Sequence, residues 1–161
     1  MDYDLVRIGP DDWKAFRDIR LRSLADAPAA FGSRYDDWVG APEERWRARL
    51  TAVPLTVLAR AGEETVGVTS GAPEGEESVE LISMWVDPAA RGSDVTAALI
   101  DAVVEWATEQ GRSTYLMVRR DNARAIRAYE KAGFVDRGVP ADWPPDEPPE
   151  NRMEHRPDHS R

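Results

Sequence analysis

The sequence contains no cysteine among its 161 residues. This absence excludes a disulfide framework, a thiolate metal site and a cysteine nucleophile. Histidine is scarce as well: His155 and His159 are the only two, and they lie near the C-terminus without a second set of ligands. We therefore expect no metal site.

Long apolar runs are also missing. No stretch approaches the ~20 apolar residues that a membrane-spanning helix requires. The N-terminus, MDYDLVRIGPDDW, lacks the basic and apolar regions of a secretory signal. These absences favour a cytoplasmic protein with no membrane partner.

Positive charge is in short supply too. The sequence has 21 lysines and arginines but 30 aspartates and glutamates, which gives a formal net charge of -9 at pH 7. Nucleic-acid binding depends on clustered cations, so we expect no nucleic-acid partner. A cationic small molecule or a basic peptide fits this charge better, although an acidic surface that serves only solubility has the same net charge.

What is present is typical of a soluble globular chain, with 42% hydrophobic and 32% charged residues. The length suits one domain over 1–161, with 156–161 as a frayed tail. No internal repeat is visible, and the proline-rich stretch 140–149 reads as a loop inside that domain.

Hydrophobic periodicity predicts an alternation of strands and helices in the order β-α-α-β-β-β-α-β-α-β-β. Strands are expected at 2–8, at 56–72 as two strands around a turn at Gly62, at 78–86, at 113–119, from Phe134 onward and at 151–156. Helices are expected from Asp11 or Asp12 to about Ala25, at 41–51, at 94–110 and from Asp121 or Asn122 to Gly133. The strand SVELISMWV at 78–86 is largely apolar throughout, as in the centre of a sheet covered on both faces.

The loop after that strand reads DPAARGS and leads directly into a helix. Free backbone N–H groups at a helix N-terminus converge on one point and favour an anion there. Arg91 adds a guanidinium suited to phosphate. Taken alone, the pattern is more typical of a surface arginine, a turn glycine and an N-cap at Ser93 or Asp94.

A second motif, DNARAIRAYEKAGF, occupies 121–134. Its spacing places Asn122, Ala125 or Ile126, and Tyr129 along one side of a helix. The C-terminal glycine, Gly133, is typical of a helix end.

Together with VELISMWVDPAARG, this motif resembles the GNAT superfamily of acyl-CoA-dependent N-acetyltransferases. In that family a strand L-x-V-x-P leads into Q/R-x-x-G-x-G/A, and a later helix reads N-x-x-A-x-x-x-Y-x-K-x-G-F. The matching residues here are Met84 in place of leucine, Val86, Pro88, Arg91, Asn122, Ala125, Tyr129, Lys131, Gly133 and Phe134. The resemblance extends over nearly the whole chain.

The resemblance implies an α/β (α+β) fold. Its centre is a mixed, mostly antiparallel sheet of six to seven strands, flanked by about four helices and splayed between the fourth and fifth strands. The co-substrate would be acetyl-CoA, with no metal. The acceptor would be a small-molecule amine or a peptide, attacked directly in a ternary complex, and a homodimer is among the assemblies that the family forms.

The resemblance also assigns roles to residues. The pyrophosphate would bind to the loop of Arg91, Gly92, Ser93, Asp94, Val95 and Thr96. A backbone N–H near Trp85 or Val86 would polarise the thioester carbonyl, and Tyr129 would protonate the departing thiolate. Further contacts with the co-substrate would come from Met84, Asn122, Ala125 and Lys131.

Glu80 is the candidate general base, because some family members carry a catalytic glutamate eleven residues before the arginine of the loop. A carboxylate in a central apolar strand is costly unless it is paired, faces a cleft or is functional. A strand-end glutamate in solvent, or one paired with an arginine, is an equally good interpretation. Phe31 and Tyr35, with Glu80, are the candidates for binding the acceptor.

Two positions depart from the family pattern. Asp94 stands where relatives carry glycine, and Thr96 stands where they carry glycine or alanine. A carboxylate beside a pyrophosphate is repelled by it. Two hypotheses therefore remain: an active N-acetyltransferase, or a non-catalytic binding or partner module with weakened CoA binding.

Overall fold

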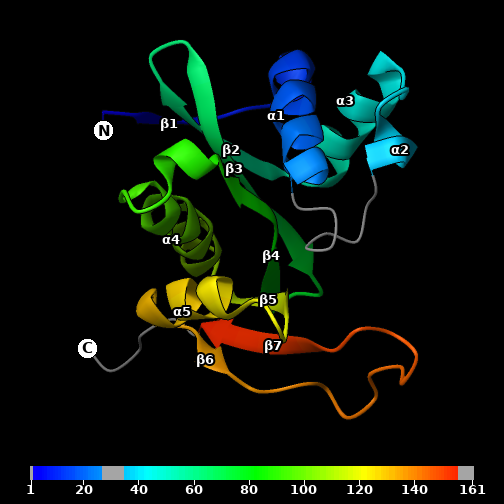
Figure 1. Cartoon of the computed structure of the whole chain (residues 1–161), viewed down its shortest axis with the longest axis vertical. Helices are drawn as coiled ribbons and strands as arrows, with labels where there is room; N and C mark the ends of the chain where they lie inside the picture. Colours follow the sequence, from blue (N-terminus) through cyan, green and yellow to red (C-terminus); the bar gives the residue numbers. More distant parts are fainter. Residues whose placement is uncertain (1, 27–34, 156–161) are drawn as a thin grey trace.

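The computed structural model describes residues 2–26 and 35–155, and its core is a seven-stranded sheet with the order β1-β2-β3-β4-β5-β7-β6 (Figure 1). The strands are β1 Asp4–Arg7, β2 Leu55–Ala61, β3 Glu64–Glu74, β4 Ser78–Val86, β5 Ser113–Arg119, β6 Val135–Asp136 and β7 Glu150–His155. Only β4 and β5 run parallel, and every other neighbouring pair is antiparallel. The expected mixed, mostly antiparallel sheet is confirmed.

Helices cover both faces of this sheet. They are α1 Trp13–Asp26, α2 Tyr35–Trp38, α3 Glu43–Ala52, α4 Val95–Glu109 and α5 Ala123–Lys131, with short 3-10 turns at Pro10–Asp12 and Pro88–Ala90. Figure 1 shows α1, α2 and α3 gathered on one side of the molecule and α4 and α5 on the other. Among these described residues, no helix is both long and apolar enough to cross a membrane.

Two apolar cores follow from the alternation of side chains along the strands. In β2, Val57 and Ala59 pack in the core beneath α4, whereas Leu58 between them packs with Phe16 and Trp46 of α1 and α3. Successive side chains of a strand point to opposite faces, so a strand covered on both sides must be apolar throughout.

A bulge bends β4 near its C-terminal end. Val68 of β3 pairs with Trp85, but Ser70 pairs with Ile82, so two residues of β4 lie opposite one residue of β3. Ser83 within this bulge has φ 56°, the left-handed region that few non-glycine residues adopt. A bulge of this kind bends its strand and increases the local twist.

β4 and β5 are paired over only three residues each and then separate. The parallel register covers only Ser78 with Ser113, Val79 with Thr114 and Glu80 with Tyr115. From Leu81 to Val86, β4 pairs with β3 alone. The splay expected between the fourth and fifth strands is confirmed.

The remaining differences from the sequence expectations concern boundaries. The first helix is preceded by a 3-10 turn, and α1 continues to Asp26, one residue beyond the expected end at about Ala25. The one-turn helix α2 was not expected, and β6 is only two residues long. The predicted tail 156–161 lies outside the described residues.

Candidate active site

A cavity of about 420 Å³ lies where β4 and β5 separate. We call it the splay cavity. Its walls come from α1, α3, both strands, one side of α5 with its N-cap, and β7. Its lining residues are Arg20, Arg49, Glu80, Leu81, Ile82, Ser83, Met84, Met117, Val118, Arg119, Asn122, Ala125, Tyr129 and Glu150. Five predicted site residues are therefore brought together here: Glu80, Met84, Asn122, Ala125 and Tyr129.

Glu80 lies on β4 at the last paired position before the splay, and its side chain is partly buried. Burial raises the pKa of its carboxyl group above the ordinary value, and the charges of Glu74 and Glu150 add to this effect. A hydrogen bond from Tyr115 and the charge of Arg152 act in the opposite direction without cancelling it. A carboxylate with a raised pKa is better suited to accept a proton near neutral pH.

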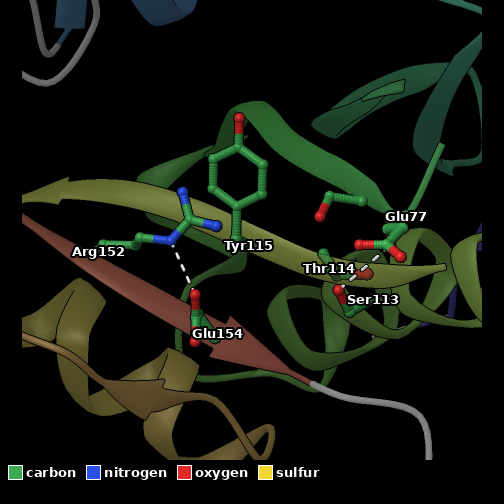
Figure 2. Close-up of a pocket in the computed structure, with 7 residues that line it drawn as sticks. Glu77, Ser113, Thr114, Tyr115, Arg152 and Glu154 are labelled. Carbon is green, nitrogen blue, oxygen red and sulfur yellow. Dashed lines mark hydrogen bonds and ion pairs between the residues drawn. The ribbon is translucent and has the colours of Figure 1, made fainter. Parts of the chain in front are cut away.

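Tyr115, which the sequence analysis did not single out, joins Glu80 to β7. Figure 2 shows its ring standing beside the guanidinium of Arg152, whose Cζ lies 3.9 Å from the ring centroid. Arg152 Nε donates to Glu154 Oε2 at 2.8 Å. Burial and the charge of Glu80 raise the pKa of Tyr115 to about 12, so its hydroxyl remains a donor at neutral pH.

Tyr129 is carried by α5 and is 8% exposed. Burial raises the pKa of its hydroxyl far above the ordinary value, which keeps the group protonated. The ring packs edge-on against Phe134, with centroids 5.8 Å apart. Asn122 begins the same helix as its N-cap, where the side chain accepts a hydrogen bond from the Ala125 amide at 3.3 Å.

Lys131 lies at the other end of α5. Its side chain is exposed and does not line the splay cavity. Two residues beyond Tyr129, it lies about 200° around the helix from the side that Asn122, Ala125 and Tyr129 share. The structure thus separates this predicted contact from the others.

The loop before α4 and the first turn of that helix have backbone N–H groups without a hydrogen-bond partner among the described residues. Within residues 2–26 and 35–155, no acceptor is bound by the backbone N–H groups of Gly92, Asp94, Thr96 and Ala97. Gly92 has φ +87°, a conformation that glycine adopts without strain. The N-terminal amides of a 15-residue helix, with its dipole behind them, form a ready site for an anion.

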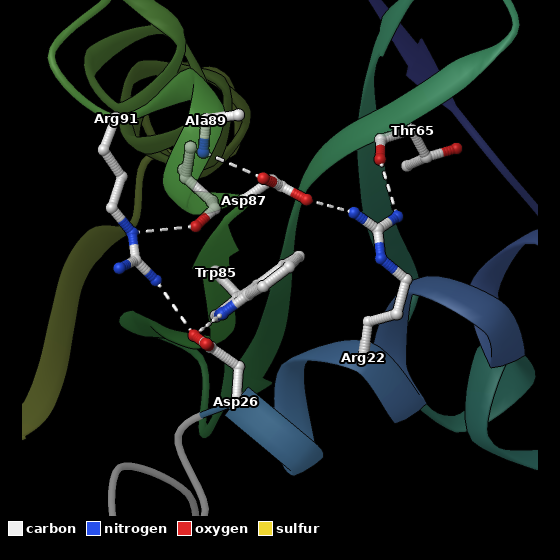
Figure 3. Close-up of polar contacts among 8 residues, drawn as sticks. Arg22, Asp26, Thr65, Trp85, Asp87, Ala89 and Arg91 are labelled. Atoms are coloured by element: carbon white, nitrogen blue, oxygen red, sulfur yellow. Dashed lines mark hydrogen bonds and ion pairs between the residues drawn. The ribbon is translucent and has the colours of Figure 1, made fainter.

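Arg91 is not free beside this loop. Its Nε donates to the Val86 carbonyl at 3.0 Å and its Nη2 lies 3.1 Å from Asp26 Oδ2 at the end of α1 (Figure 3). The Trp85 indole donates to the same carboxylate at 3.0 Å. These contacts lower the pKa of Asp26, the Trp85 hydrogen bond most strongly. Arg91 and Trp85 are thus fastened to α1, and neither lines the splay cavity.

Asp94 occupies the N-cap position of α4, but its side chain makes no capping hydrogen bond. Ser93 Oγ accepts from the Val95 amide instead, at 3.4 Å. The Tyr3 hydroxyl lies 3.4 Å from the Asp94 carbonyl oxygen, and burial followed by the charge of the Asp94 carboxylate raises the pKa of Tyr3. The carboxylate is therefore exposed and close to Tyr3, while Val95 is buried and Thr96 is partly buried.

Three arginines line the cavity and were not among the predicted site residues: Arg119 of β5, and two that enter from the helices, Arg20 and Arg49. Arg20 of α1 is 8% exposed, and burial together with the charge of Arg49 lowers its pKa to about 10. Burial alone lowers the pKa of Arg49, on α3, to about 10. A signal was available for Arg20, which falls within the apolar stripe of its helix, where a charged side chain is out of place.

Of the residues predicted to bind the acceptor, only Glu80 is seen to line the splay cavity. Tyr35 is exposed on α2 and does not line the splay cavity, and Phe31 lies outside the described residues. Among the described residues, no group of three or more acidic or histidine side chains is arranged to hold a metal ion.

The acetyltransferase (GNAT) family model matches residues 13–134, which contain β4, the loop, α4 and α5. The chain belongs to the GNAT acetyltransferase family. A relative detected by sequence is an uncharacterised N-acetyltransferase of Methanocaldococcus jannaschii, 35% identical over 71 residues. That match covers 44% of this chain and 31% of the relative.

Solved GNAT structures share the fold at low identity. The chain is similar to yncA of Salmonella typhimurium, solved with its cofactor acetyl-CoA, with a TM-score of 0.76 and 16% identity over 100% of this chain and 98% of that one. It is also similar to the paia N-acetyltransferase of Thermoplasma acidophilum in complex with coenzyme A, with a TM-score of 0.75 and 15% identity over 97% and 99% of the two chains.

Proposed function

We propose that this GNAT protein transfers the acetyl group of acetyl-CoA to a primary amine by direct attack in a ternary complex. The observation that carries the proposal is that Glu80 and Tyr129 line one cavity at the point where β4 and β5 separate. A partly buried carboxylate of raised pKa and a buried, protonated phenol suit the base and the acid of such a reaction.

Two different parts of acetyl-CoA, its pyrophosphate and its pantetheine arm, can bind near the point where β4 and β5 separate. The four unpaired amides of the loop and the first turn of α4 suit the pyrophosphate. The unpaired edge of β4 beyond Glu80 suits the extended pantetheine arm, which then adds to the sheet as a further strand. Asn122 and Ala125 line the cavity beside that path.

In the reaction, Glu80 takes a proton from the acceptor ammonium, directly or through water, and the neutral nitrogen attacks the thioester carbonyl carbon. A backbone N–H of Trp85 or Val86 stabilises the oxyanion that forms. The C–N bond is then complete and the C–S bond breaks. As the oxyanion collapses, the Tyr129 hydroxyl supplies a proton to the departing sulfur. The nitrogen, which carries a positive charge after the attack, loses its second proton to the Tyr129 phenolate through water, so that a neutral amide, a CoA thiol and a protonated Tyr129 remain.

The second candidate is a non-catalytic module of the same fold, and two observations favour it. Asp94 places an exposed carboxylate at the N-terminus of α4, where a pyrophosphate would bind. Arg91 is already engaged with Asp26 and the Val86 carbonyl. Both features weaken the attraction of the loop for a dianion.

Titration calorimetry with acetyl-CoA, followed by a CoA-release assay over an amine panel, separates the two candidates. The proposal expects binding at or below millimolar acetyl-CoA and release of CoA with at least one amine. No heat and no thermal shift at millimolar ligand overturns it. Binding without turnover on any amine favours the module.

A further inference from the structure

We infer that the acceptor amine carries an oxyanion and that Arg49, with Arg20 beside it, binds that group in the splay cavity. This inference rests on the proposed function and specifies its substrate class. The acceptor is then a small zwitterion of the amino-acid type, with its amine toward Glu80 and its anionic group toward α1 and α3.

The bonding of Arg49 is incomplete. Its Nη2 donates to Ser83 Oγ at 3.0 Å and to Ser70 Oγ at 3.3 Å, and its Cζ lies 5.2 Å from the Phe16 ring centroid. Its Nη1 is buried and has no hydrogen-bond partner among the described residues. One side of the guanidinium fork is therefore unused.

No protein carboxylate neutralises this charge within the described ranges. None of the ion pairs there includes Arg49, although it lines the cavity together with Glu80 and Glu150. Residues 27–34, between the two ranges, contain no aspartate or glutamate, so that segment has no carboxylate side chain to offer.

The arrangement is electrostatically costly without a ligand. A partly buried charge without a counter-ion loses hydration, and the hydrogen bonds of Arg49 to two neutral hydroxyl groups replace only part of it. Arg20 is a second buried guanidinium, whose pKa is lowered by burial and then by the charge of Arg49, and whose Nη1 donates to Ser23 Oγ at 3.4 Å. At a pKa of about 10, both groups stay protonated at neutral pH. An oxyanion between α1 and α3 removes this cost, because a guanidinium pairs with carboxylate or phosphate through two parallel hydrogen bonds.

The two carboxylates of the cavity lie on strands, whereas Arg20 and Arg49 lie on helices. Glu80 stands on β4 and Glu150 on β7; the third arginine of the lining, Arg119, lies on β5, where its charge acts on Glu150. This separation orients a zwitterion: the end that binds the carboxylates is the amine that must lose a proton to Glu80. A volume of about 420 Å³ suits a small molecule.

The alternative role for Arg49 is to brace the bulge through Ser83. That role uses Nη2 only, so it does not explain the buried and unpaired Nη1. It also predicts no dependence of turnover on the charge of the acceptor, which makes the two roles separable by experiment.

The test uses three probe sets: the pooled natural amino acids, the same pool as carboxamides, and phosphoethanolamine. CoA release gives kcat/KM, and a thermal-shift assay without acetyl-CoA gives binding. The variants are Arg49→Gln, Arg49→Lys, which keeps the charge without the planar fork, and the control Arg45→Gln, an exposed position of the same helix outside the cavity lining.

We expect the wild type and the Arg45 variant to prefer an anionic acceptor over its uncharged analogue by about tenfold or more, the effect of a charge-assisted hydrogen bond. Arg49→Gln abolishes the preference, and Arg49→Lys retains part of it. Activity on the amino acids assigns the oxyanion as a carboxylate, and activity on phosphoethanolamine alone assigns it as a phosphate.

Acetylation of amino acids and carboxamides at equal, measurable rates by the wild type, with no faster turnover of phosphoethanolamine, overturns the inference and leaves the proposed function standing. An unchanged preference in both Arg49 variants overturns it as well. If no amine is acetylated but the amino acids or phosphoethanolamine still raise the melting temperature of the wild type and not of Arg49→Gln, the oxyanion site stands and the proposed function fails.

Discussion

The Tyr115 hydroxyl donates a hydrogen bond to the carboxylate of Glu80, its partner across the short parallel register of β4 and β5. The contact lies at the last paired position before the two strands separate. It holds the Glu80 carboxylate at the edge of the splay cavity while leaving its pKa raised, since burial outweighs the hydrogen bond.

Replacing Glu80 with glutamine removes the proposed base while preserving the size of the side chain. We expect kcat/KM to fall by about 10²–10⁴-fold, the usual contribution of a general base. In the wild type, kcat/KM should fall as the pH drops through the raised pKa of Glu80, at a pH above the ordinary value of 4.5. A pH–rate profile that is the same in Glu80→Gln and the wild type contradicts the assignment. Glu77→Gln, at an exposed site, is the control.

Replacing Tyr115 with phenylalanine tests the hydrogen bond itself. A donor to a carboxylate favours the ionised form, so its loss raises the pKa of Glu80 further. The acidic limb of the pH–rate profile should move to higher pH, with little change in kcat on the plateau. A limb that moves to lower pH, or stays in place, shows that the hydroxyl does not act on Glu80.

Replacing Tyr129 with phenylalanine removes the proposed acid but keeps the ring that packs against Phe134. We expect kcat to fall by at least about 10²-fold, while the dissociation constant for acetyl-CoA changes little. Because the pKa of Tyr129 is raised far above neutrality, its ionisation should add no alkaline limb below pH 10. Stopped turnover assays and calorimetry on the same preparation measure both quantities, and an unchanged kcat removes the role.

Replacing Asp94 with asparagine should strengthen acetyl-CoA binding. Two like charges ~4 Å apart repel by about 1 kcal/mol in water, which corresponds to roughly fivefold in the dissociation constant. The gain should shrink as salt is added, because ions screen exposed charges. Asp101→Asn, an exposed position further along α4, serves as the control and should change nothing. Equal affinities for Asp94→Asn and the wild type mean that the carboxylate lies away from the ligand.

Replacing Asp26 with asparagine weakens the link between α1 and the loop. The pKa of Asp26 is lowered in the folded protein, so its carboxylate adds stability above the ordinary pKa of 3.8, and this stability is lost as the pH falls through the folded value. We expect the variant to lose at most about 1 kcal/mol of unfolding free energy at pH 7, because the pair is solvent-screened. Denaturant titrations should show the difference shrinking as the pH falls below 3.8 towards the lowered folded pKa; a constant difference rules out the ion pair as its source.

The regular parts of the fold were predictable because their signals are local. The strands at 78–86 and 113–119 have the predicted bounds, and the helices end where Gly111 and Gly133 take positive φ values. An amphipathic stripe and a C-terminal glycine need no knowledge of the rest of the chain.

The site was only partly accessible to the same reasoning. Motif spacing brought Asn122, Ala125 and Tyr129 to one side of α5, and all three line the splay cavity. Arg20 and Arg49 escaped because they meet through the packing of two helices, and no sequence pattern records that contact. The attachment of Arg91 to Asp26 joins residues 65 apart in sequence and was hidden for the same reason.

Between Leu81 and Val86, one edge of β4 has no strand beside it. A ligand laid along that edge is gripped by peptide groups, which every residue type except proline supplies equally. If acetyl-CoA binds along this edge as proposed, the side chains of β4 between Leu81 and Val86 can be substituted without loss of its backbone hydrogen bonds. In our proposal the acceptor is selected instead by the side chains of Arg20 on α1 and Arg49 on α3, with Glu80 at the start of that edge. Binding of acetyl-CoA and selection of the acceptor then depend on different elements of the fold, so substitutions in α1 and α3 can change the acceptor without changing the binding of acetyl-CoA.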